Sequence, residues 1–151
     1  MHPFRKLQKF AGLSGVRRRL FLEAVFELTR AQLSAALIPF RWLAPGFGRL
    51  MAESPEIYDA THERAILDLR WAIGTAASQL PWHSRCLVRA TAVKWMLCRR
   101  RIPSTLYLGV APGTAKTWDA HAWVRCGTIV LTGGPQHLNY RVLVKFADFY
   151  A

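Results

Sequence analysis

Acidic residues are scarce in this chain of 151 residues, which carries 9 Asp and Glu against 21 Lys and Arg and has a formal net charge of +12. It is nevertheless 52% hydrophobic and 12% aromatic, a composition that excludes a disordered chain. A chain of this length can bury a hydrophobic core without disulfides or metals. We therefore predict one basic, compact domain.

Cysteines are also few and widely spaced. The three of them, Cys86, Cys98 and Cys126, are an odd number and contain no CxxC pair. This pattern excludes a closed disulfide framework and a cysteine zinc site, so we expect no metal and no cofactor. A reducing cytoplasm is the simplest location.

No apolar run reaches the roughly 20 residues that cross a bilayer. The arginines at 17–19 precede an apolar stretch in the manner of a signal peptide, but Glu23, Glu27 and Arg30 interrupt it. We expect neither a signal peptide nor a membrane span. The basic N-terminal helix remains a candidate for peripheral contact with the inner face of the membrane.

The charge falls into three blocks. Residues 1–50 hold nine basic and two acidic side chains, residues 51–84 two and five, and residues 85–151 ten and two. The two basic blocks create a positive electrostatic potential, which attracts anionic partners. A basic nucleic-acid-binding module is therefore one alternative, although no RNP, zinc-finger or helix-turn-helix signature supports it and we expect no nucleic acid partner.

Apolar spacing predicts three helices in the first two thirds of the chain. The first is capped by Ser14 and ends before Pro39, the second runs from Ser54 and Pro55 to about Leu80, and the third begins at Ser84 and ends near Arg101. Short β-rich segments then follow at 105–110, 118–126 and 128–131, and 142–149 is either a strand or a short helix. The order indicates an α+β fold with an antiparallel meander, in which a basic helical segment (1–50) belongs to the same domain as the core (51–151).

Cys86 stands in the first turn of the third predicted helix. Unpaired amides and the helix dipole favour a thiolate there, and Arg85 and Arg89 add positive charge. A base is required beside such a nucleophile, and His121 is the histidine that falls inside a predicted strand, between Ala120 and Ala122. A helix cysteine facing a strand histidine is the arrangement of nucleophilic acyl chemistry. A structural role for each residue is the alternative.

The run from Cys86 to Pro103, the segment LYLGV at 106–110 and the segment HAWV at 121–124 together resemble the transglutaminase-like peptidases of lasso-peptide biosynthesis. These are the B proteins of microcin J25-type pathways in their stand-alone form. The resemblance implies a helix packed on a small antiparallel sheet, as in papain-like enzymes. It also implies ATP-independent removal of the leader from a precursor peptide, with Cys86 as nucleophile and His121 as general base.

The partners implied are the precursor leader, a separate leader-recognition protein and an ATP-dependent lasso cyclase. The family pattern also places an Asp about a dozen residues after the histidine, where this chain reads Leu131-Thr132-Gly133-Gly134. A two-residue loop at 126–127 would set Thr132 opposite His121, which makes it one candidate for orienting the imidazole. Asp119 on the same strand face is another, and a water or a backbone carbonyl remains open. Acyl transfer to an amine, on the same fold, is the alternative reaction.

Overall fold

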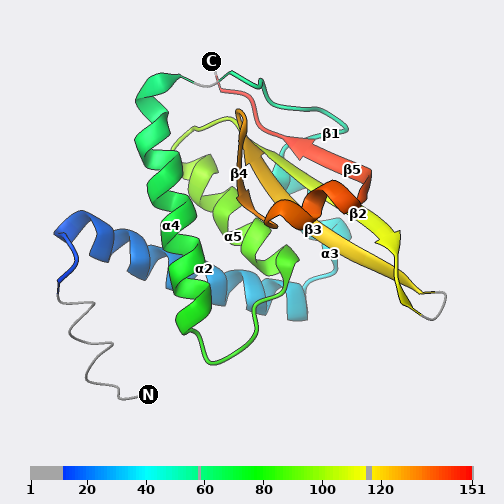
Figure 1. Cartoon of the computed structure of the whole chain (residues 1–151), viewed down its shortest axis with the longest axis horizontal. Coiled ribbons are helices and arrows are strands. Elements are labelled where there is room, and N and C mark those ends of the chain that lie inside the picture. The colour runs from blue at the N-terminus through cyan, green and yellow to red at the C-terminus, as the bar shows by residue number, and fades with distance from the viewer. Residues whose placement is uncertain (1–11, 58, 115–116, 151) are drawn as a thin grey trace.

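The computed structural model describes residues 12–57, 59–114 and 117–150. Three long helices, α2, α4 and α5, gather at one side of a five-stranded antiparallel sheet, and α5 packs between the other helices and the sheet (Figure 1). The predicted α+β class is confirmed. Arg5, Lys6 and Lys9 of the predicted basic N-terminal segment lie outside the described residues.

Helix α2 (Gly15–Leu37) begins and ends as its sequence predicts. The Ser14 hydroxyl accepts a hydrogen bond from the Arg17 amide at 3.4 Å, and the helix stops two residues before Pro39. Its inner face carries Ala24, Leu28 and Ala31, which lie in the core. The two alanines allow close packing of the helix. The short helix α3 (Phe40–Leu43), the 3-10 turn η1 (Ala44–Phe47) and strand β1 (Arg49–Leu50) follow.

Helix α4 (Glu63–Gln79) starts later than predicted. Ser54 was expected to cap it, but Ser54 is buried, and its amide and hydroxyl both lie 2.8 Å from the Thr105 hydroxyl. A side chain engaged with a distant strand cannot cap a helix. The chain turns instead through η2 (Ala60–His62), whose cap is Asp59.

The third helix, α5 (Cys86–Arg99), leads into the sheet, whose strand order is β1-β5-β2-β3-β4. The last four strands are β2 (Thr105–Pro112), β3 (Trp118–Cys126), β4 (Ile129–Thr132) and β5 (Arg141–Ala147). The segment 142–149, which the sequence could not assign to a helix or to a strand, therefore forms a strand as far as Ala147. The expected simple meander is wrong in one respect, because β5 follows the 3-10 turn η4 (Pro135–Asn139) and pairs with β2 on the far side of the hairpin.

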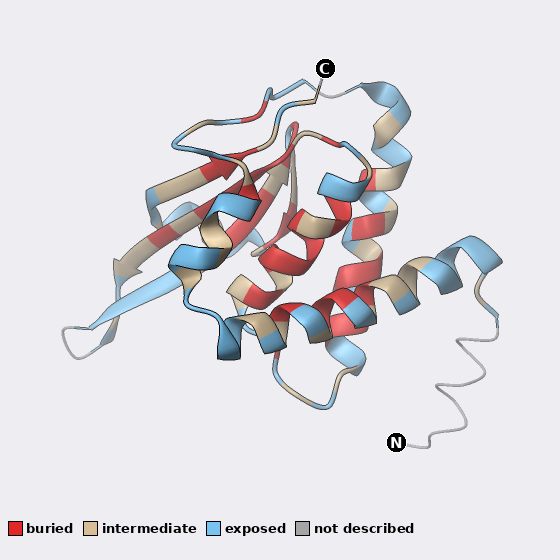
Figure 2. Ribbon diagram, turned by 180° about the vertical axis from the view of Figure 1, so that it is seen from behind, coloured by how far each residue is buried: buried red, intermediate tan, exposed pale blue. Residues whose placement is uncertain are grey.

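Buried residues concentrate on α5, on the inner faces of α2 and α4 and on the strands beside them (Figure 2). Within this core Lys94 of α5 is fully enclosed, and its ammonium lies 2.7 Å from the Asp148 carboxylate and 2.7 Å from the Ser104 carbonyl oxygen. Burial lowers the pKa of Lys94, and the Asp148 carboxylate opposes that change. This contact ties α5 to the segment after β5, and nothing in the sequence pattern indicated it.

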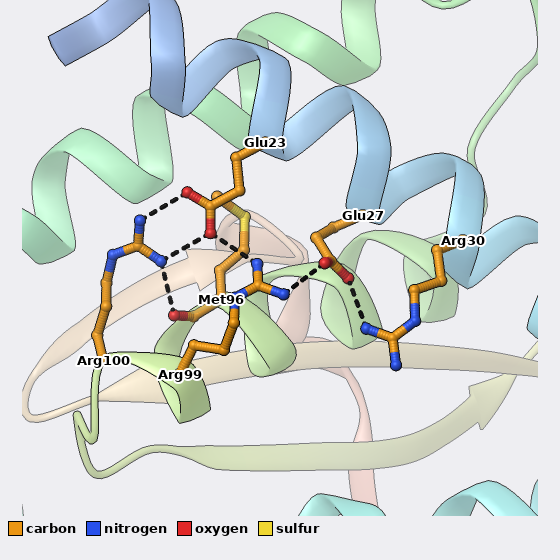
Figure 3. A network of polar contacts seen from close by, with 6 residues as sticks. All are labelled: Glu23, Glu27, Arg30, Met96, Arg99 and Arg100. Atoms are coloured by element: carbon orange, nitrogen blue, oxygen red, sulfur yellow. Dashed lines mark hydrogen bonds and ion pairs between the residues drawn. The ribbon is translucent and has the colours of Figure 1, made fainter.

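A second ionic contact joins α2 to the end of α5. Arg99 and Arg100 bind Glu23, and Arg99 also binds the buried Glu27 (Figure 3). Hydrogen bonds, chiefly from Arg100, lower the pKa of Glu23. The arginines after α5 thus bind within the chain. None of the helices in the described ranges is both long and apolar enough to cross a membrane.

Candidate active site

Cys86 is the first residue of α5, and its side chain is half-buried at the margin of the core. The predicted cap, Ser84, is not the cap. Ser84 is buried, and its hydroxyl accepts a hydrogen bond from the Arg89 Nε at 2.9 Å. The N-cap position is held by Arg85, whose side chain makes no capping hydrogen bond.

The start of α5 therefore has unpaired amides beside a thiol. The first backbone bond into the helix runs from the Arg89 amide to the Arg85 carbonyl, so the amides of residues 86–88 have no intrahelical acceptor. No side chain in the described ranges accepts from them either. Unpaired amides at a helix start attract negative charge, which suits both a thiolate and the oxyanion of an acyl-transfer intermediate.

His121 lies in β3 directly opposite Gly109 of β2 and is half-buried. Its Nε2 is 2.9 Å from the carbonyl oxygen of Gly133, and its ring stacks on Tyr140 with centroids 4.8 Å apart. The ring centroid also lies 6.0 Å from that of Trp123. The imidazole is thus oriented by one hydrogen bond and two aromatic neighbours.

The acceptor for the imidazole is a backbone carbonyl twelve residues after the histidine, which was one of the open alternatives. Gly133 has a φ of +95°, and a Cβ there would lie 2.5 Å from that of Trp123 and 3.1 Å from the His121 Nε2. Only glycine brings the backbone this close. Sequence reasoning missed Gly133 because a carbonyl carries no residue signature.

The expected position of Thr132 opposite His121 is wrong. The hairpin loop is 127–128 rather than 126–127, since Cys126 pairs with Ile129, and an irregularity in the pairing then sets Thr132 opposite Val124. The Thr132 hydroxyl is buried without a hydrogen-bond partner in the described part of the chain. Asp119 is exposed and pairs with Ala111, and it makes no hydrogen bond to His121.

Cys86 and His121 are not joined by a hydrogen bond within the described residues. Along β3, Ala122 and Val124 lie in the core that includes α5, and His121 alternates with them. Successive side chains of a strand point to opposite faces, so His121 projects from the face away from α5. The expected facing pair is thus absent from this conformation, and the catalytic assignment stays a prediction.

The edge of β3 near His121 is contacted by Gly133 but is not paired with β4. β4 pairs with β3 only at residues 124–126, so the strand from Trp118 to Trp123 has no β4 partner. Beyond the last pair the chain runs close to β3 at Gly133, whose carbonyl binds His121, and continues through Gly134; both glycines have positive φ.

A polar network supports the face that carries His121. Tyr107, which stacks on Trp123 at 5.3 Å, donates a hydrogen bond to Glu53 and accepts one from Arg125. Lys145 also binds Glu53. The hydrogen bond from Tyr107, followed by the one from Lys145, lowers the pKa of Glu53. The network fixes Trp123, which in turn packs over Gly109, where a Cβ would lie 3.0 Å from the indole.

The other two cysteines have different surroundings. Cys126 is buried, which raises the pKa of its thiol to about 11, and its sulfur donates to the Pro103 carbonyl. Cys98 is exposed near the end of α5. Within the described ranges, no group of three or more His, Cys, Asp or Glu residues could hold a metal ion.

The sequence model of the Transglutaminase-like superfamily matches residues 34–145, which is most of the chain and includes both Cys86 and His121. The chain belongs to the transglutaminase-like superfamily. No curated protein and no solved structure matches it. Members of the superfamily are in general cysteine-based enzymes of the papain-like peptidase and acyltransferase type, and the α5-on-sheet core of this chain is consistent with that group.

Proposed function

We propose that this transglutaminase-like protein is a cysteine peptidase that removes the leader from a lasso-peptide precursor. The observation that carries the proposal is the half-exposed Cys86 at the uncapped start of α5. A peptidase of this type needs a nucleophile and a donor for the oxyanion at one place, and the amide of Cys86 can serve as that donor. The residues quoted above, LYLGV and HAWV, supply the resemblance to lasso-peptide B proteins.

The proposed reaction has two balanced steps. His121 takes the thiol proton, the sulfur attacks the carbonyl carbon of the last leader residue, and the C–N bond breaks as the proton passes to the amine of the core peptide. Water then attacks the thioester, His121 takes its proton, and the leader leaves with a free carboxylate while the thiol is restored. Neither step consumes ATP.

This mechanism requires His121 to reach the sulfur of Cys86. With Nε2 donating to Gly133, the nitrogen available as base is Nδ1. We propose that the contact between His121 and Cys86 forms in the substrate complex through a change in the backbone of β3 near His121, because rotation of the side chain alone leaves it on its own face of the sheet. The Gly133 carbonyl takes the orienting role that an Asp has in the family pattern.

The partners follow from the same proposal. The precursor leader is the substrate, a separate leader-recognition protein presents it, and an ATP-dependent cyclase consumes the freed amine. We propose that cleavage takes place in the cytoplasm.

The test is cleavage of a candidate precursor by the purified chain together with its leader-recognition protein. We expect two products whose summed mass exceeds the precursor by one water, and loss of cleavage in Cys86→Ala but not in Cys98→Ala. The Cys98 variant is the matched control because Cys98 lies on the same helix and is exposed. Products that carry the mass of an added amine would identify an acyl transferase instead. Cleavage by Cys86→Ala at the wild-type rate would overturn both the peptidase and the acyl-transferase proposals.

A further inference from the structure

The outward face of α2 carries large apolar side chains that are mostly exposed. Leu22, Phe26, Leu33 and Leu37 are between 55% and 78% exposed. Their spacing of four, seven and four residues places them within about 60° on the helix surface and along about 22 Å of its length. We call these four residues the α2 stripe. It lies opposite the buried face formed by Ala24, Leu28 and Ala31.

The α2 stripe continues toward α3. Trp42, in the helix that follows, is 72% exposed, and Ile38 lies between them and is 40% exposed. A shallow groove beside the stripe is lined by three stripe residues together with Thr29, Arg30, Ser34 and Ile38. Exposed apolar patches of this extent mark interaction sites more often than accidental exposure does.

Within the described part of α2 and α3, no carboxylate faces outward beside the stripe. Glu23 and Glu27 are the acids of residues 1–52, and both are engaged by arginines of α5 (Figure 3). Arg19 at one end of the stripe and Arg41 at the other are exposed. The face is therefore mainly apolar, with exposed arginines at its ends and Arg30 beside its groove, and Figure 2 shows exposed segments recurring along α2.

The placement of the positive charge distinguishes between kinds of partner. Between the two ends, Arg30 is the remaining cation of α2, and it is held by Glu27 and lies 4.1 Å over the Trp95 ring. An acidic protein partner is best matched by cations along both flanks of an apolar groove. Cations at the ends of an apolar helix instead suit a lipid surface, where the apolar side chains enter the acyl region and the arginines reach the phosphates.

We propose that the α2 stripe, with Trp42, docks the protein on an anionic lipid surface. The helix lies in the plane of the interface, because its inner face remains packed on α4 and α5. This inference does not depend on the proposed peptidase activity, and its test uses no substrate.

The test is co-sedimentation with vesicles of phosphatidylcholine containing about 30 mol% phosphatidylglycerol, against vesicles of phosphatidylcholine alone. We expect at least tenfold tighter binding to the anionic vesicles. The variant Leu33→Ser/Leu37→Ser should weaken it at least tenfold. The matched control is Ile57→Ser/Leu138→Ser, which changes two apolar residues that are 89% and 79% exposed elsewhere and should bind as the wild type does.

A second pair of variants tests the charge. Arg41→Glu should weaken anionic binding several-fold more than Arg70→Glu, which makes the same change of net charge at an exposed position of α4. Thermal melts that are unchanged in all these variants exclude misfolding as the cause.

Several outcomes would overturn the proposal. These are absence of binding to anionic vesicles, equal weakening in the Ile57/Leu138 control, or equal effects of Arg41→Glu and Arg70→Glu. Light scattering that shows a wild-type dimer, converted to a monomer by the stripe variant, would mean that a second copy covers the stripe.

Discussion

At the scale of single residues, His121 is held by neighbours that act on different parts of its ring. The Gly133 carbonyl binds Nε2, while Tyr140 covers one ring face. The sequence indicated the histidine itself, because HAWV in a strand is part of the family resemblance. It could not indicate Gly133 or Tyr140, since one acts through its backbone and the other comes from the far end of η4.

Tyr140 gives a prediction at this scale. Tyr140→Ala removes the stacking partner and should lower kcat by roughly two- to tenfold, because an aromatic pair contributes about 0.5–1.5 kcal/mol. Tyr140→Phe keeps the ring and should retain near wild-type kcat, and KM should change little in both. The measurement is steady-state cleavage, with Leu138→Ala, an exposed neighbour in η4, as control. If Tyr140→Phe loses as much kcat as Tyr140→Ala does, or if only KM changes, the positioning role is contradicted.

At the scale of elements, two predicted N-caps were wrong because both serine hydroxyls have other partners. Ser54 and Ser84 look like N-caps, but Thr105 and Arg89 occupy their hydroxyls. Cap propensity describes which hydrogen bond a serine can make to its own helix, and a side chain such as Thr105 on a distant strand or Arg89 within the same helix can take that hydroxyl instead. The hairpin shows the same limit. A one-residue difference in loop position and an irregular pairing moved Thr132 away from the histidine. The helices and strands with strong periodicity were predicted well.

The uncapped start of α5 predicts opposite changes in stability and activity. Arg85→Ser places a good capping residue at the N-cap and should stabilise the fold by about 1 kcal/mol. The same cap draws a first-turn amide away from the site, so cleavage should slow. Thermal unfolding and cleavage rates measure the two effects, and Arg85→Ala, which adds no cap, is the control. A variant that gains stability with no loss of rate contradicts a role for these amides.

At the scale of the whole molecule, the basic charge is partly used inside the fold. Arg99 and Arg100 join the end of α5 to Glu23 on α2. Hydrogen bonding holds the pKa of Glu23 below its ordinary value of 4.5. A carboxyl with a depressed folded pKa adds stability that is fully present above about pH 4.5 and is lost as the pH falls through the folded value.

Glu23→Gln should therefore melt lower than the wild type at pH 7, by roughly 2–4 °C, the shift that a loss of about 1 kcal/mol causes in a chain of this length. The difference should shrink as the pH falls below about 4.5. Melting curves between pH 3 and 7 check this, with Glu56→Gln, at an exposed position, as control. A difference that is the same at pH 3 and pH 7 would contradict the ionic contact.

The central claim is that Cys86 carries the acyl group of the leader during cleavage. Intact-protein mass spectrometry of a reaction quenched in acid before steady state tests it most directly. The account predicts an adduct equal in mass to the free leader minus one water, located on Cys86 and absent from Cys86→Ala. In His121→Ala, adduct formation and cleavage should both slow. Cleavage by the wild type at the same rate as by Cys86→Ala, with no adduct at any time, would contradict the account.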